Sequence, residues 1–168
     1  MVIDQHRAHI RILYEEFISK HEKDQMGNVQ KVMFPEVTEL TPSEVIVYER
    51  LSDQLSQMGF EILNLGGGSY SVNGIPPGLK DVNPLVLFQD IIHTAAEGTA
   101  YSRHDLSQDL YHDICLTLSQ SAACPYGQVL GNTEMEDIIN RLFACQNPNY
   151  TPDGKPILHI IPQSAIEL

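Results

Sequence analysis

The chain has 168 residues, of which 42% are hydrophobic and 19% are charged, and its formal net charge is −12. A domain of this length buries about 70% of its unfolded surface, so it needs no disulfide or structural metal to sustain a core. The acidic balance excludes a domain that grips the DNA backbone alone, because phosphate binding needs Lys and Arg gathered on one surface.

The cysteines and the apolar runs indicate the cellular compartment in which such a chain is found. There are three cysteines and no CxxC, which argues against a disulfide framework or a zinc ribbon and favours a reducing compartment. No run reaches the about 18 apolar residues of a membrane span, and the start is not that of a signal peptide. We therefore expect a cytoplasmic domain that does not contact membranes.

The first predicted elements are a strand, a helix and a long extended segment. Val2 and Ile3 suit a buried strand, and residues 7–20 have apolar residues at helical spacing. That apolar face comprises Ile10, Leu13, Tyr14, Phe17 and Ile18. An extended segment leads into a strand candidate at residues 36–40, where Pro35 favours an edge position. Because the chain enters a strand at its first residues, we expect it to be part of a longer protein.

The middle of the chain predicts a capped helix, a hairpin and a second helix. Thr41 and Glu44 form a capping box for a helix that Gly59 ends. Residues 60–63 and 69–72 flank three consecutive glycines, which is typical of a β-hairpin. A helix follows; its apolar residues Leu85, Phe88, Ile91, Ile92 and Ala95 recur at helical spacing.

Two helices and a strand are predicted in the last third. The first helix spans residues 102–122. Thr133 and Glu136 form a second capping box, which opens a helix. Its expected inward face comprises Met135, Ile138, Ile139, Leu142 and Phe143. Residues 156–161 are dense in branched apolar residues and predict the last strand.

Residues 4–16 read DQHRAHIRILYEE, at the point where the first strand passes into the first helix. The stretch resembles the signature DQHAxxExxxxE of the C-terminal domain of the MutL family of DNA mismatch repair proteins. Its first three residues match, and Glu15 matches the final Glu. Arg7 replaces the motif's Ala, and Ile10 replaces its central Glu, which is a metal ligand in the family members that nick DNA.

The resemblance also implies where a metal site would lie. Asp4 and His6 offer a carboxylate and an imidazole, and nicking relatives add a Cys and a His from a CPHGRP motif. Residues 151–156 resemble that motif, with Thr151 in place of the Cys and Asp153 in place of the His. A catalytic metal needs about three protein ligands. We therefore expect no catalytic residue, no cofactor in this domain, and a remnant site that could hold Mn or Zn weakly.

Two further motifs of the family have weaker counterparts. Ala123 and Cys124 match part of a motif centred on ACR, and we expect Cys124 to be a packed residue instead of a ligand. Gln30 to Phe34 resembles a short motif that docks on the replication sliding clamp. Its candidate contacts are Gln30, Val32, Met33 and Phe34. An ordinary strand explains the same residues equally well.

The element order and the resemblance predict a two-lobed α+β fold with mixed sheets and flanking helices. A dimerisation lobe would comprise residues 1–28 and 98–168, and a second lobe, residues 29–97, would be inserted into it. The resemblance implies a homodimer that contacts mismatch repair proteins and meets DNA indirectly, with ATP bound by an N-terminal domain outside this sequence. We expect a non-catalytic dimerisation and partner-binding domain; the alternative is a metal-dependent DNA-nicking endonuclease with a rearranged site.

Overall fold

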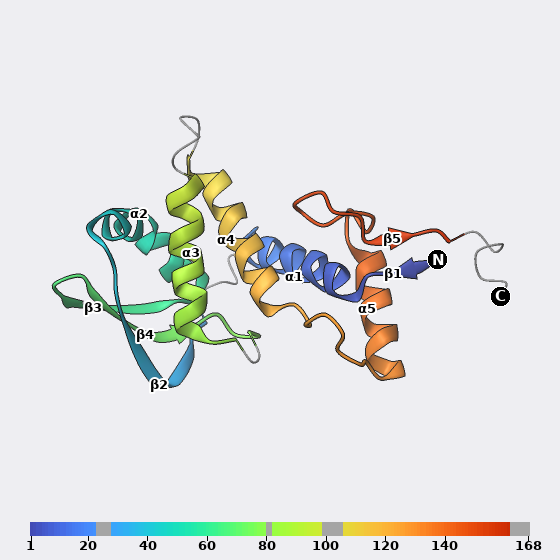
Figure 1. Cartoon of the computed structure of the whole chain (residues 1–168), viewed down its shortest axis with the longest axis horizontal. Coiled ribbons are helices and arrows are strands. Elements are labelled where there is room, and N and C mark those ends of the chain that lie inside the picture. The colour runs from blue at the N-terminus through green and yellow to red at the C-terminus, as the bar shows by residue number, and fades with distance from the viewer. Residues whose placement is uncertain (23–27, 80–81, 99–105, 162–168) are drawn as a thin grey trace.

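The structure is a computed structural model that describes residues 1–22, 28–79, 82–98 and 106–161 (Figure 1). Helices and two small antiparallel sheets give an α+β fold, as the sequence predicts, although mixed sheets were expected. In chain order the elements are β1 (Val2–Ile3), α1 (Gln5–Glu22), β2 (Gln30–Glu39), α2 (Pro42–Met58), β3 (Glu61–Gly66), β4 (Ser69–Ile75), α3 (Pro84–Gly98), α4 (Leu106–Ala122), α5 (Asn132–Ala144) and β5 (Leu158–His159).

The larger sheet has the strand order β2-β4-β3, with the predicted β3–β4 hairpin at one side. The hairpin turn uses glycines because Gly66, Gly67 and Gly68 all have positive φ, a conformation that side chains disfavour. Strand β2 pairs with the other side of β4 and lies at the sheet edge, in agreement with Pro35. Its register shifts between Lys31 and Glu36.

Helix α2 begins and ends as its sequence predicts. The Thr41 hydroxyl accepts a hydrogen bond from the Glu44 backbone N–H at 3.4 Å, and the Glu44 carboxylate accepts one from the Thr41 N–H at 2.8 Å. Gly59 ends the helix with φ of 98°. The helix buries one apolar stripe, which comprises Val47, Leu51, Leu55 and Met58. This stripe fixes α2 against the rest of the main core.

The main core lies between the sheet and helices α1 to α4. Helix α3 crosses one face of the sheet (Figure 1), and its Phe88 is fully buried in the same cluster as Tyr70 of β4. The opposite face of the sheet is more open. Val37 and Leu63 both lie opposite Ser71 in the strand register, and each is about half exposed.

Helix α1 is buried on two sides. Four residues of its predicted face pack into the main core, namely the buried Phe17 and the partly buried Leu13, Tyr14 and Ile18. Ala8 and Ile12 lie outside that face and form a second, smaller core with α5 and the segment before β5. The partners there are Ile138, Leu142 and Ile157. One amphipathic stripe was expected from the sequence, whereas a helix between two cores needs two.

Helix α4 packs against both α1 and α3 and so connects the two ends of the molecule (Figure 1). Its Ile114 and Leu118 belong to the main core. The start predicted for this helix, at residue 102, lies outside the described residues. The division into a lobe of residues 29–97 and a lobe built from the flanking segments stays a prediction.

Helix α5 begins earlier than predicted, so the expected Thr133 cap is wrong. The backbone N–H of Gly131 donates to the Glu134 carboxylate at 2.7 Å, and Gly131 has the extended conformation of an N-cap residue. Two glutamates stand three residues after a possible cap, and the earlier pair forms the helix end. Only Ile138 and Leu142 of the predicted inward face are buried. The other three, Met135, Ile139 and Phe143, are 43%, 40% and 51% exposed.

Strand β1 has its predicted bounds but is less buried than expected, and β5 is shorter than the strand predicted at residues 156–161. Val2 pairs with His159 and Ile3 with Leu158, and this ladder has only two residues on each side. Val2 is 48% exposed and Ile160 is 87% exposed, although Ile157 is fully buried. A two-stranded ribbon covered on one side leaves its other face in solvent. Among the described residues, no helix has the length and apolar character needed to span a bilayer.

Candidate functional site

The junction between β1 and α1 carries the residues that the resemblance singled out. Asp4 Oδ1 accepts the backbone N–H of Arg7 at 3.0 Å, so Asp4 caps the first turn of α1. The backbone N–H of Asp4 donates to the Ile157 carbonyl at 3.0 Å. The cap therefore also ties the start of the chain to the segment that enters β5.

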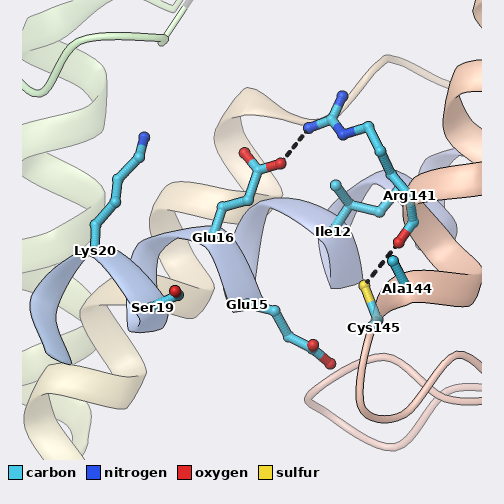
Figure 2. Close-up of a pocket in the computed structure, with 8 residues that line it drawn as sticks. All are labelled: Ile12, Glu15, Glu16, Ser19, Lys20, Arg141, Ala144 and Cys145. Carbon is cyan, nitrogen blue, oxygen red and sulfur yellow. Dashed lines mark hydrogen bonds and ion pairs between the residues drawn. The ribbon is translucent and has the colours of Figure 1, made fainter. Parts of the chain in front are cut away.

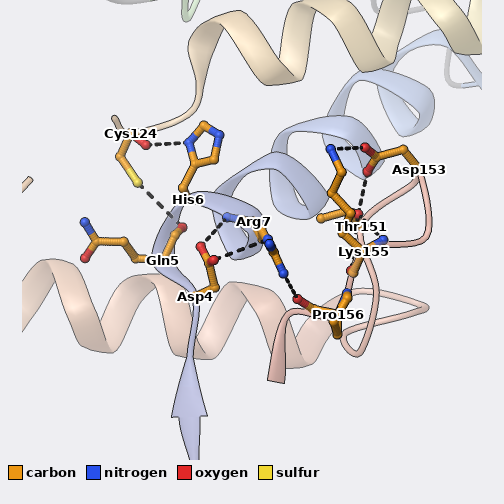
Figure 3. A network of polar contacts seen from close by, with 9 residues as sticks. All are labelled: Asp4, Gln5, His6, Arg7, Cys124, Thr151, Asp153, Lys155 and Pro156. Carbon is orange, nitrogen blue, oxygen red and sulfur yellow. Dashed lines mark hydrogen bonds and ion pairs between the residues drawn. The ribbon is translucent and has the colours of Figure 1, made fainter. Parts of the chain in front are cut away.

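The guanidinium of Arg7 lies against the remaining oxygen of Asp4 (Figure 3). Its Nε is 3.3 Å from Asp4 Oδ2, a charge contact without hydrogen-bond alignment, and its Nη1 donates to the Pro156 carbonyl at 2.8 Å. Both side chains are mostly buried, with 27% and 23% of their surface exposed. Both oxygens of Asp4 are thus engaged by groups of the chain itself.

Residues 151–156 form the tight turn that the sequence predicts, with Gly154 at φ of 82°. The buried Thr151 hydroxyl donates to Asp153 Oδ1 at 2.5 Å, and Lys155 Nζ lies 2.8 Å from Asp153 Oδ2. Burial pushes the pKa of Asp153 up, but hydrogen bonds from Lys155 and Thr151 outweigh it and lower the pKa. Asp153 is therefore an ionised carboxylate whose charge is balanced by Lys155 of the same turn.

His6 and Cys124 meet on the other side of the junction (Figure 3). His6 Nδ1 lies 2.8 Å from the Cys124 carbonyl, and the His6 ring contacts the Tyr126 ring at 4.1 Å between centroids, with the two planes tilted by 44°. His9 Nδ1 accepts the Cys124 N–H at 3.0 Å, and burial lowers the pKa of His9. The Cys124 thiol donates to the Gln5 carbonyl at 3.5 Å, and burial raises its pKa. A neutral, packed thiol is a poor metal ligand.

These residues do not fit a divalent metal ion. Asp4 and Asp153 are each neutralised by a cation of the chain, and His6 turns toward Cys124, away from both carboxylates (Figure 3). Ile10, which replaces the motif's central Glu, is buried. No set of three or more His, Cys, Asp and Glu in the described ranges is arranged to hold a metal. The sequence candidates Asp4, His6 and Asp153 are not brought together as ligands.

Glu15, the final Glu of the motif, has a structural role. Its carboxylate accepts the backbone N–H groups of Gln146 and Asn147 at 2.8 and 3.3 Å, just beyond the end of α5. Arg11 Nη1 lies 3.6 Å from the same carboxylate. Glu15 therefore anchors the C-terminal end of α5 to α1, a long-range contact that no sequence spacing reveals.

A cleft of about 360 Å³ lies between α1 and α5 (Figure 2). Arg141 spans its rim and donates to Glu16 at 2.6 Å and to Asp137 at 3.1 Å. Cys145 lies in the cleft wall, and burial raises its pKa to about 11. The thiol therefore stays protonated near neutral pH and is not a nucleophile.

A family model covers the N-terminal three-quarters of the chain. Residues 1–130 match the family model described as "MutL C terminal dimerisation domain". The chain belongs to this family. The resemblance drawn from residues 4–16 is thereby confirmed.

Individual members of the family match almost the whole chain. The "DNA mismatch repair protein MutL" of Bacteroides fragilis (strain YCH46) is 43% identical over 167 residues, which cover 99% of this chain and 26% of that protein. The protein of the same name from Phocaeicola vulgatus is 42% identical with the same coverage. That of Chlorobaculum parvum is 34% identical over 94% of this chain and 24% of its own. The chain spans about a quarter of the length of these relatives.

The segment that resembles the family's sliding-clamp motif lies in the edge strand β2. Met33 and Phe34 are 86% and 81% exposed, Gln30 is exposed, and Val32 is half-buried. An exposed amide and two exposed apolar side chains are what a docking motif needs. The same exposure fits an edge strand, so clamp binding stays a prediction.

Helix α5 has an exposed apolar surface, which is of interest because the family description names dimerisation. Met135, Ile139 and Phe143 recur every fourth residue and form a stripe on one side of the helix, hereafter the α5 stripe. The helix lies at the end of the molecule far from the larger sheet (Figure 1). The sequence holds the signal for this surface, since five apolar positions are too many for one buried face of a short helix.

Proposed function

We propose that this chain is the part of a DNA mismatch repair protein that joins two copies of that protein. The family is named for dimerisation, and relatives that match nearly the whole chain are named as mismatch repair proteins. The observation that carries the proposal is the α5 stripe. Analytical ultracentrifugation of the chain should give the mass of a dimer. A strict monomer at high protein concentration would contradict the proposal.

The α5 stripe fits a second copy of the same chain. Three large apolar side chains in a row on one helix lower the free energy when they leave water together. A two-fold axis beside α5 would set the same stripe of both copies face to face, as in most homodimers. The flanking Glu136 and Asn140 are exposed and suit the polar rim of such an interface.

We propose that the domain itself does not catalyse a reaction and uses no metal cofactor. The support is the pairing of Asp4 with Arg7 and of Asp153 with Lys155. The net charge of −12 supports a scaffold that meets DNA through partners or other parts of the protein. The three free thiols support a cytoplasmic location.

A nicking assay separates this proposal from the endonuclease alternative. The full-length protein, incubated with supercoiled plasmid and Mn²⁺, should nick no faster than its Asp4→Asn variant. The physical reason is that the Asp4 carboxylate is already paired with the guanidinium of Arg7 and, within the described residues, is not part of a set of metal ligands. A reaction without Mn²⁺ is the control. Mn²⁺-dependent nicking that disappears in the Asp4→Asn variant would establish the endonuclease instead.

We also propose that the exposed end of β2 binds the replication sliding clamp. A Gln30→Ala, Phe34→Ala double change removes the amide and the most accessible aromatic side chain, so clamp retention in a pull-down should fall by about tenfold or more. Val86→Ala removes a half-exposed apolar side chain from α3, outside β2, and should leave retention unchanged. Equal retention by both variants would remove clamp binding from the proposed functions.

A further inference from the structure

Two cations of the chain stand beside the two carboxylates where the family resemblance would locate a metal. Arg7 faces Asp4 from the same helical turn, and Lys155 faces Asp153 across the tight turn. The two pairs are near enough for the charge of Arg7 to lower the pKa of Lys155, although Asp153 is the largest influence and the pKa of Lys155 is raised overall. Arg7 and Lys155 thus balance the negative charges of both carboxylates at the junction.

Arg7 does more than neutralise Asp4, because it also reaches a distant backbone group. The same guanidinium contacts the Asp4 carboxylate and donates to the Pro156 carbonyl, 149 positions further along the chain. A divalent cation joins parts of a fold in a comparable way, by binding carboxylate and carbonyl oxygens. A guanidinium offers fixed N–H donors to the same two kinds of oxygen.

The backbone around this bridge is continuous with the smaller core. The Asp4 N–H donates to the Ile157 carbonyl at 3.0 Å, and the Ile157 N–H donates to the Asn149 carbonyl at 2.8 Å. Ile157 is fully buried beside Ala8. Whatever holds residue 156 against the start of α1 therefore also holds the strands β1 and β5 together.

We propose that Arg7 performs the structural task of a bound cation: it clamps the β1–α1 junction to the segment that enters β5. Lys155 neutralises the second carboxylate of the junction. The clamp consists of the Arg7 side chain, the Asp4 carboxylate and the Pro156 carbonyl, so the end of the molecule that carries the α5 stripe is held together without a divalent ion. This inference is independent of the proposed dimer, because it concerns how one copy holds its own ends.

Amide hydrogen exchange of the chain tests the clamp. Arg7→Met keeps an unbranched stem in place of the aliphatic part of arginine and removes the charge and the donors, so exchange at the Asp4 and Ile157 amides should accelerate by about 10- to 100-fold. Arg141→Met is the matched control, since Arg141 joins α5 to α1 through Glu16 and lies outside the junction. That variant should leave exchange at these two amides unchanged. Unchanged exchange in Arg7→Met would overturn the proposal.

A conservative variant and a metal titration complete the test. Arg7→Lys keeps the positive charge but lacks the planar N–H donors of the guanidinium, so it should accelerate amide exchange to an intermediate degree. This variant keeps the test usable where Arg7→Met fails to fold. The thermal midpoint of the wild-type chain should be the same in EDTA, Mn²⁺ and Zn²⁺. A rise of about 5 °C or more with either metal, lost in Asp4→Asn, would show that an ion holds the junction and would overturn the clamp.

Discussion

A double change of Ile139 and Phe143 to aspartate should convert the proposed dimer of this chain into a monomer. Both side chains belong to the α5 stripe and are 40% and 51% exposed in a single copy. Across a two-fold interface each aspartate would lie in an apolar contact of both copies, without a partner for its charge. A hot-spot residue of an interface contributes about 2 kcal/mol or more, so loss of two should cost about 4 kcal/mol and raise the dissociation constant at least about 100-fold.

The same substitution on another exposed apolar residue separates the interface from general surface effects. Val86 of α3 is 50% exposed and lies outside the α5 stripe. Val86→Asp should sediment as the wild-type dimer does. Circular dichroism should show the same helical content for all three proteins, since the changed residues are accessible to water in each copy. A double variant of α5 that still sediments as a dimer would move the interface away from this helix.

The α5 stripe also marks a limit of sequence reasoning. The apolar residues of α5 were expected to form one inward face, but only Ile138 and Leu142 are buried. Periodicity identifies a helix with a wide apolar surface. It does not show which of those apolar residues pack into the core and which face a partner. The division depends on Ile12 and Ile157, which reach α5 from opposite ends of the sequence.

Local chemistry was predictable where the contacts are local. Thr41 with Glu44, Gly59 and the glycine turn before β4 all behave as their sequence patterns predict, because each acts within a few residues. Asp4 likewise caps the helix that follows it. The cap predicted at Thr133 was wrong: Gly131 and Thr133 each precede a glutamate by three residues, and the helix begins at the earlier pair.

The sequence predicted where the candidate site lies, but only some of the contacts that its residues make. The motif located Asp4 and the turn at Asp153, whereas the loss of metal chemistry that the missing ligands indicate stays a prediction. The role of Arg7 was invisible, since its acceptor is the carbonyl of Pro156. Glu15 was equally invisible, because the amides it accepts follow α5, about 130 residues away. Both contacts arise from tertiary packing, which a pattern of residue types does not encode.

Leu142→Ala should be the most destabilising single change at the α5 end of the molecule. Leu142 is fully buried in the smaller core, which has few other large side chains to close around a void. Truncation of such a leucine costs about 2 to 5 kcal/mol, which lowers the thermal midpoint of a chain of this size by about 4 to 20 °C. Differential scanning calorimetry measures the shift directly.

Ile139→Ala, one turn earlier on the same helix, provides the contrast because its side chain faces outward. In a single copy it should cost about 1 kcal/mol or less, since alanine favours the helix and little core contact is lost. In the dimer it removes interface contact, so its effect on the thermal midpoint should depend on protein concentration. The loss caused by Leu142→Ala should persist at every concentration, because the cavity lies within one copy. Equal, concentration-independent losses for both variants would mean that the two faces of α5 do not have separate roles.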